Sequence, residues 1–71
     1  MRFKYQPGDL IVYIPPSDPN DLSDINIIIR HEPDPDEEYY DEYYVFEVKT
    51  QQYATWNRRI VEQPEWWKLV G

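Results

Sequence analysis

The chain has 71 residues, a formal net charge of −7 and no cysteine. A single domain of this length buries only about 60% of the surface that its unfolded chain exposes, and the lack of cysteine excludes disulfides and cysteine-ligated zinc as additional stabilisation. The negative charge disfavours binding to nucleic-acid phosphates or anionic lipid and favours a basic partner.

Aromatic side chains are the remaining source of stability, because three Trp, seven Tyr and two Phe each bury a large area in a small core. The start of the chain lacks the uninterrupted apolar run of a signal peptide, and no segment is long and apolar enough to cross a membrane. We therefore expect one domain over residues 1–71, located in the cytoplasm, with neither a membrane nor nucleic acid as a direct partner.

Two strands are predicted in the first half of the chain. Residues 10–14 follow the turn signal Pro7-Gly8 and are apolar, β-branched or aromatic, and residues 25–30 contain four isoleucines. Three prolines within residues 15–24 exclude a helix or a central strand, so we expect a loop of about ten residues there. Period-two alternation assigns these side chains to the core: Leu10, Val12, Ile14, Ile25, Ile27 and Ile29.

Two further strands, a helical turn and a closing strand are predicted in the second half. The third strand covers residues 40–50. Its better core face carries Tyr44, Phe46 and Val48. Residues 53–61 have strand propensity and no helical apolar stripe, so the fourth strand is expected there. Pro64 favours a helical turn over residues 62–65, before a short strand over residues 66–70.

These elements predict an all-β fold, a small five-stranded SH3-like antiparallel barrel with a long early loop and a short helical turn before the last strand. The segments Pro7-Gly8-Asp9-Leu10-Ile11-Val12 and Pro64-Glu65-Trp66-Trp67-Lys68-Leu69-Val70 resemble parts of small SH3-like barrels, particularly those that bacteriophages encode. The resemblance implies a fold but no single function, because such barrels serve many functions. The chain lacks the acidic and aromatic signature of peptide-binding SH3 domains and the basic loop of RNA-binding barrels, so neither activity is carried over.

The most distinctive stretch is an acidic, tyrosine-rich segment, residues 34–43, which we call the acidic window. No basic residue occurs between His31 and Lys49, and this interval holds eight of the fourteen carboxylates and four of the seven tyrosines. Tyrosine supplies contact area with one polar end, and carboxylates steer and pair with Lys or Arg. The predicted partner-binding residues are Asp34, Asp36, Glu37, Glu38, Tyr39, Tyr40, Asp41, Glu42 and Tyr43.

No catalytic or metal-binding pattern is recognisable in the chain. The first carboxylates of the window superficially match a calcium loop, but Tyr39 stands where glycine is needed and Val45 where a bidentate glutamate is needed. The pair Asp36 and Glu38 is expected to be solvated rather than to act as an acid and a base. His31, which follows a strand and precedes Glu32, is expected to be a surface residue or a weak salt-bridge partner, without a nucleophile beside it. We therefore expect no enzymatic activity, no cofactor and no metal.

Three functions remain open. In the first, the window docks on a basic or DNA-binding host protein and inhibits or redirects it. In the second, the carboxylates imitate DNA phosphates in the cleft of a restriction, repair or defence nuclease. In the third, the window only keeps the protein soluble, and the protein is a structural or assembly component of a viral particle.

Phosphate mimicry requires two rows of carboxylates. Alternate residues of a strand are about 6.6 Å apart, whereas a DNA strand carries one charge per roughly 3.4 Å of axis, so one row has about half the charge density. Asp18, Asp21 and Asp24 would supply the second row if their loop lay beside the window.

The C-terminal part carries a smaller basic and aromatic group. Arg58, Arg59 and Lys68 lie near Trp56 and Trp66 in sequence, a composition similar to a platform for single-stranded nucleic acid. Three cations are few against the overall charge, so the tryptophans are expected mainly in the core or at its rim. A weak homodimer that pairs this group with the acidic window of a second copy remains open beside a monomer.

Overall fold

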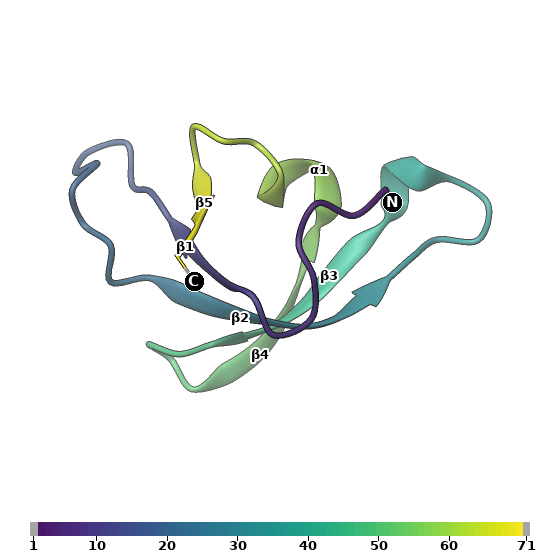
Figure 1. Cartoon of the computed structure of the whole chain (residues 1–71), viewed down its shortest axis with the longest axis horizontal. Helices are drawn as coiled ribbons and strands as arrows, with labels where there is room; N and C mark the ends of the chain where they lie inside the picture. The colour runs from purple at the N-terminus through teal and green to yellow at the C-terminus, as the bar shows by residue number, and fades with distance from the viewer. Residues whose placement is uncertain (1, 71) are drawn as a thin grey trace.

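The computed structural model describes residues 2–70 and consists of five antiparallel strands in one sheet with the order β4-β3-β2-β1-β5 (Figure 1). The elements are β1 (Leu10–Tyr13), β2 (Ile25–Glu32), the 3-10 turn η1 (Glu38–Tyr40), β3 (Glu42–Glu47), β4 (Gln52–Asn57), α1 (Arg58–Val61) and β5 (Trp67–Leu69). The predicted fold class is confirmed, since the described chain is all-β with a long loop after β1 and a helical turn before β5. Met1 and Gly71, the ends of the predicted 1–71 domain, lie outside the described residues.

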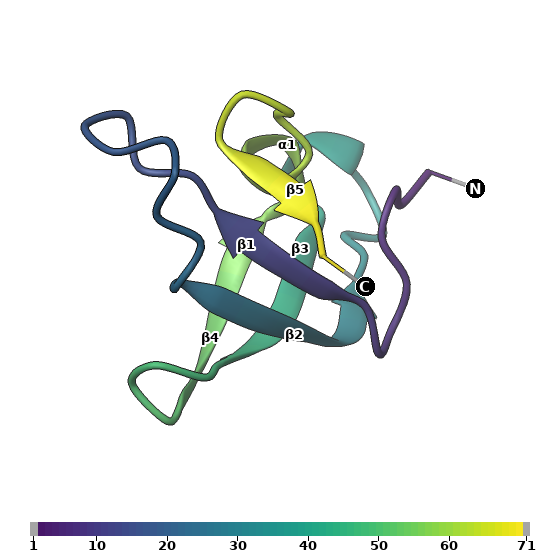
Figure 2. The same cartoon turned by 60° about the vertical axis from the view of Figure 1, so that its left-hand side comes forward.

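The sheet is strongly curved and forms a partly open barrel. Figure 2 shows β1, β2 and β5 crossing β3 and β4 at a steep angle. The edge strands β4 and β5 are not neighbours in the described sheet, but the ring centroids of Trp56 and Trp67 approach to 5.9 Å across the gap. The core comprises Phe3, Tyr5, Ile11, Ile28, Tyr43, Val45, Val61 and Trp67. Half of these residues are aromatic, in agreement with the composition.

The predicted core faces of β2 and β3 are wrong. The structure buries Ile28 and Val45, which are direct partners across the two strands, whereas Ile29 and Val48 are each 37% exposed. The other predicted core residues of this region, Ile25, Ile27, Tyr44 and Phe46, are only half buried. Period-two alternation does not identify the inner face of a strand when apolar residues occupy both faces. The buried face is then the one that the rest of the chain covers.

In β1 the predicted core face is only partly right. Val12 is fully buried as predicted, but Ile11 is fully buried too, while Leu10 and Ile14 are half buried. Consecutive strand residues point to opposite faces, so β1 is covered on both sides. Within the sheet, β1 is an internal strand that pairs with β2 on one side and with β5 on the other.

The predicted boundaries of the later elements also shift. The third strand is Glu42–Glu47 instead of residues 40–50, because η1 precedes it and the chain reverses after it, with Gln51 at a φ of 59°. The fourth strand ends at Asn57, whose side-chain oxygen accepts a hydrogen bond from the Arg59 N–H at 2.9 Å and caps α1. The helical segment therefore begins one turn earlier than the predicted residues 62–65, and the closing strand is limited to Trp67–Leu69.

The N-terminal segment, residues 2–6, runs across the open side of the barrel (Figure 1). Phe3 and Tyr5 are 7% and 3% exposed. His31 of β2 holds this segment, because its ring stacks on Phe3 with centroids 4.0 Å apart and its Nε2–H donates to the Tyr5 carbonyl at 2.7 Å. The prediction of His31 as a surface residue is corrected, since the N-terminal segment covers it and leaves it half buried.

Candidate functional site

The structure divides the acidic window into an exposed part and a buried part. Asp34 is half buried, and Asp41 and Tyr43 are completely buried. The exposed part comprises Asp36, Glu37, Glu38, Tyr39, Tyr40 and Glu42. The prediction of Asp41 and Tyr43 as partner-binding residues is therefore corrected, because both side chains point into the protein, where no partner reaches them.

Asp34 shapes the loop that presents the exposed part. Its Oδ1 accepts hydrogen bonds from the N–H groups of Asp36 and Glu37, each at 2.9 Å. The Glu37 carbonyl accepts a hydrogen bond from the Tyr40 N–H at 3.0 Å, and this is the first hydrogen bond of η1. Carboxylate capping of successive backbone N–H groups is the usual way in which aspartate stabilises a turn. The exposed side chains therefore stand on an ordered turn.

Asp41 is the centre of a buried ion cluster. Arg2 Nε and Nη2 donate to its two carboxylate oxygens at 2.7 and 2.5 Å, and Arg58 Nε donates at 3.1 Å. The Asp34 N–H adds a further hydrogen bond at 2.9 Å. The hydrogen bond from Arg2 lowers the pKa of Asp41 below its ordinary value, although burial acts in the opposite direction. Asp41 is thus neutralised by residues that lie far away in sequence.

The Tyr43 hydroxyl connects the core to the N-terminal segment and to α1. It accepts a hydrogen bond from the Tyr5 N–H at 3.1 Å and donates one to a Glu62 carboxylate oxygen. Glu62 also accepts from the Lys4 N–H at 2.8 Å and from Arg58 Nη1 at 3.1 Å. Burial and then the hydrogen bond to Glu62 raise the pKa of Tyr43. Its role is therefore structural.

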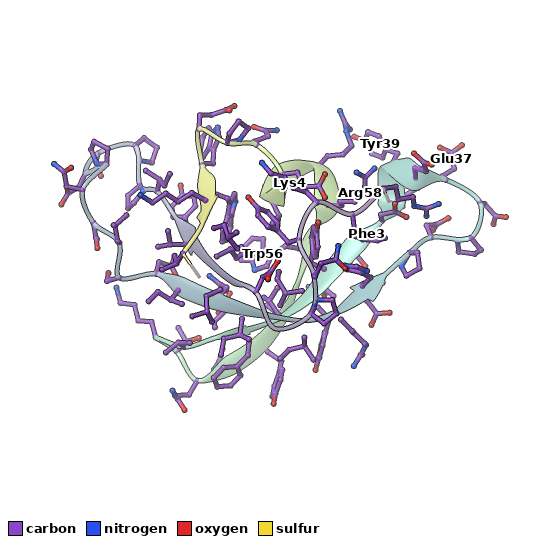
Figure 3. The ribbon with its side chains drawn as sticks, viewed as in Figure 1. Phe3, Lys4, Glu37, Tyr39, Trp56 and Arg58 are labelled. Atoms are coloured by element: carbon purple, nitrogen blue, oxygen red, sulfur yellow. The ribbon has the colours of Figure 1, made fainter. Side chains whose placement is uncertain are left out.

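The tyrosines of η1 form an exposed aromatic pair. Tyr39 and Tyr40 are 53% and 59% exposed, and their rings meet edge to face with centroids 5.1 Å apart. The guanidinium of Arg59 lies 4.3 Å from the Tyr39 ring centroid and supports that ring from the side of α1. Figure 3 places Tyr39 and Glu37 at one end of the molecule and Trp56 near its centre.

The second acidic row that phosphate mimicry requires does not lie beside the window. Asp18, Asp21 and Asp24 belong to the segment between β1 and β2. Figure 1 shows this segment and the acidic window at opposite ends of the longest axis, which measures 37 Å. The window thus presents one row of carboxylates, with about half the charge density of a DNA strand.

A second candidate site is a pocket lined by aromatic rings, which we call the aromatic pocket. Its walls are the rings of Tyr13, Trp56, Trp66 and Trp67, and its volume is about 310 Å³. The ring centroid of Tyr13 lies 5.4 Å from that of Trp67 and 6.4 Å from that of Trp66. The polar part of the lining is Asp24, Asn26 and Glu47. The pocket therefore combines a large aromatic surface with carboxylates.

Two buried polar atoms at this pocket have no hydrogen-bond partner within residues 2–70, the Asn26 Oδ1 and the Trp56 Nε1. Asn26 is only 1% exposed, and its Nδ2 donates to the Asp24 carbonyl at 3.4 Å, which leaves Oδ1 unpaired. A buried polar group without a partner costs roughly 1–3 kcal/mol. Asn26 and Trp56 both line the pocket, so the unpaired acceptor and the unpaired donor belong to residues of one candidate site, although the two atoms themselves are buried.

The basic and aromatic group predicted near the C-terminus does not assemble. Arg58 turns to Asp41, Arg59 lies over Tyr39, and Lys68 is not among the residues that line the aromatic pocket. The tryptophans lie at the rim of the core, as predicted, but carboxylates accompany them. The sequence contains no signal for this pocket beyond its unusual number of tryptophans, because the lining residues come from separate segments.

Within residues 2–70, no three side chains of His, Cys, Asp or Glu gather in a way that would hold a metal ion. No helix in the same residues has the length and apolar character needed to span a membrane. Comparisons of the chain with family models, curated proteins and solved structures gave no match. The candidate sites are therefore the exposed part of the acidic window and the aromatic pocket.

Proposed function

We propose that the protein is a non-enzymatic interaction protein that docks on a basic surface of another protein through the exposed part of the acidic window. The observation that carries this proposal is the Tyr39 and Tyr40 pair, two rings more than half exposed on an ordered turn. Exposed tyrosines that are held in place lose little conformational entropy on binding, and tyrosine is enriched at the centres of protein interfaces.

The charges around this pair support a basic partner. Asp36, Glu37 and Glu42 take part in no ion pair within residues 2–70, and Glu38 lies 3.8 Å from Arg2 in an exposed and therefore weak contact. Carboxylates at the rim of an interface accelerate association with a positively charged surface and make it dependent on salt. The resemblance to phage-encoded barrels makes a host protein the expected partner, which docking inhibits or redirects.

The proposal is tested with two variants of equal charge. The window variant carries Asp36→Asn, Glu37→Gln and Glu42→Gln. The control variant carries Asp18→Asn, Asp21→Asn and Glu65→Gln outside the window. Each set removes three of the chain's carboxylates and so changes the formal net charge from −7 to −4. Asp41 stays unchanged in both, because it is buried in the ion cluster.

Each tagged protein is used to capture partners from a bacterial lysate, and the Kd of each purified complex is measured at low and moderate salt, with and without duplex DNA. We expect the wild type and the control variant to retain the same basic protein. The window variant should bind it about tenfold more weakly, which corresponds to about 1.4 kcal/mol, and with a smaller dependence on salt. Equal affinities of the two variants contradict the proposal, and displacement by DNA would favour phosphate mimicry instead.

A further inference from the structure

We propose that the aromatic pocket binds an arginine side chain presented by a peptide segment of a partner. The guanidinium stacks on the pocket rings and donates hydrogen bonds to the carboxylates of the lining, and a rotation of the buried Asn26 amide makes its Oδ1 a further acceptor. This site goes beyond the proposed function and does not depend on it, because the pocket and the acidic window share no residue.

The rings of the pocket are available to a ligand. The chain's own guanidinium groups stack elsewhere, with Arg30 at 4.1 Å from the ring centroid of Tyr44 and Arg59 at 4.3 Å from that of Tyr39. Within residues 2–70, no lysine or arginine lies over any of the four pocket rings. Tryptophan is the best aromatic partner for a cation, and three of the four rings are tryptophans.

The polar part of the lining selects a cation. Asn26 of β2 and Glu47 of β3 are direct cross-strand partners, so their side chains lie on the same face of the sheet, with Cβ atoms about 4.5–5.5 Å apart. Asp24 lies two residues before Asn26 and adds a second carboxylate. Among the described residues, no lysine or arginine lines this pocket. Two carboxylates beside aromatic faces attract a positive group and repel an anion.

The unpaired atoms restrict the kind of cation. Asn26 Oδ1 needs a donor, which a guanidinium supplies and a quaternary ammonium does not. A guanidinium is favoured over a lysine ammonium because it is planar and more weakly hydrated, and because it stacks on rings while donating several hydrogen bonds. The Trp56 N–H needs an acceptor, and a backbone carbonyl beside the arginine supplies it. Both atoms are buried, so an arginine within a peptide satisfies them once the Asn26 and Trp56 side chains rotate toward it.

The dimensions of the pocket agree with this occupant. A volume of about 310 Å³ lies at the lower end of the range for ligand pockets, so it suits one long side chain and a peptide group rather than a large cofactor. Ile60 and Trp66, which are 50% and 41% exposed, supply apolar surface at the rim. This surface offers contacts to the residues on either side of the arginine.

The test is an NMR titration of the full chain with capped tripeptides that differ only in the central residue. The three residues are arginine, its neutral analogue citrulline, and trimethyl-lysine. The indole N–H signal of Trp56, assigned with a Trp56→Phe variant, reports occupation of the pocket. We expect a saturable shift with the arginine peptide and a Kd higher by about tenfold or more for each of the other two, because citrulline lacks the charge and trimethyl-lysine lacks N–H donors.

A variant of the pocket separates binding from stability. Asn26→Leu replaces the amide, whose Oδ1 is unpaired and whose Nδ2 makes only a long hydrogen bond of 3.4 Å, by an apolar group of similar volume. We therefore expect an equal or higher Tm together with about tenfold weaker binding of the arginine peptide. Glu47→Gln tests the same site if Asn26→Leu does not fold, and should weaken binding several-fold. The matched control Glu65→Gln lies outside the pocket and should leave the Kd unchanged.

The outcomes distinguish this proposal from the proposed function. The window variant should bind the arginine peptide as the wild type does, so each proposal is able to fail alone. Equal affinity for the arginine and citrulline peptides would overturn the proposal. A Trp56 signal that stays in place throughout the titration would do the same.

Discussion

Separate replacement of Ile28 and Ile29 by alanine tests which face of β2 points into the core. The two residues are adjacent in one strand and chemically identical, so the loss of β-propensity is similar in both variants. Ile28 is 1% exposed and belongs to the core, whereas Ile29 is 37% exposed. The alternation in the sequence predicts the opposite order, so the comparison discriminates between the two assignments.

The expected difference follows from burial. Ile28→Ala removes fully buried atoms and leaves a cavity, which costs about 2–5 kcal/mol of the free energy of unfolding. Ile29→Ala removes a side chain that already contacts water, and we expect a cost of about 1 kcal/mol. A difference of about 2 kcal/mol between the variants corresponds to roughly 8–16 °C in Tm for a domain of this size.

Thermal unfolding followed by circular dichroism measures the two Tm values, and urea titrations check that the m-value is the same in both variants. If Ile28→Ala does not fold, Ile28→Val and Ile29→Val provide a milder pair, with expected costs of about 1 kcal/mol and close to zero. Equal destabilisation by the two replacements, or a larger effect at Ile29, would refute the assignment of faces.

Three further predictions concern the buried polar groups. Tyr43→Phe leaves the buried Tyr5 N–H without a partner and removes one of the three hydrogen bonds to Glu62, so it should lower the free energy of unfolding by about 1–3 kcal/mol in urea titrations. Tyr53→Phe, on a 60% exposed side chain, should change it by less than about 0.5 kcal/mol. Because the fold raises the pKa of Tyr43, the contribution of this residue to the free energy of unfolding is complete below the unfolded-state pKa of about 10. Above that pH the wild type should lose about 1.4 kcal/mol of stability per pH unit in urea titrations. An equally steep loss in Tyr43→Phe would contradict this assignment. The hydrogen bond from Arg2 lowers the pKa of Asp41, so the contribution of Asp41 is present above its ordinary pKa and is lost as pH falls through the lower, folded-state value. Asp41→Asn should therefore flatten the loss of stability below about pH 4, which acid titration followed by circular dichroism measures against the wild type.

The sequence alone determined the fold class and the order of the five strands, because these depend on local information. Prolines exclude regular structure in residues 15–24, and runs of β-branched and aromatic residues favour strands wherever they occur. The exposed part of the acidic window was predictable for the same reason, since consecutive carboxylates such as Asp36, Glu37 and Glu38 stay in water unless partners are supplied. The N-terminal segment had no such local signal, although Phe3 and Tyr5 belong to the core.

Only the tertiary structure decided which residues of the window are buried. Asp41 and Tyr43 are polar residues in an acidic segment, and burial of such groups is costly unless partners are supplied. The partners are Arg2, Arg58 and Glu62, which lie 39, 17 and 19 residues away from the groups that they contact. Composition and spacing within the window contain no information on them.

The aromatic pocket also exists only in the folded chain. Tyr13 ends β1, Asn26 lies in β2, Glu47 ends β3, and Trp56 and Trp66 come from β4 and from the turn before β5. The curvature of the sheet brings these separate segments together. The sequence shows which side chains are available to form a site. Which of them lie next to one another was decided by the packing of the whole chain, and the chemistry of the site depends on those contacts.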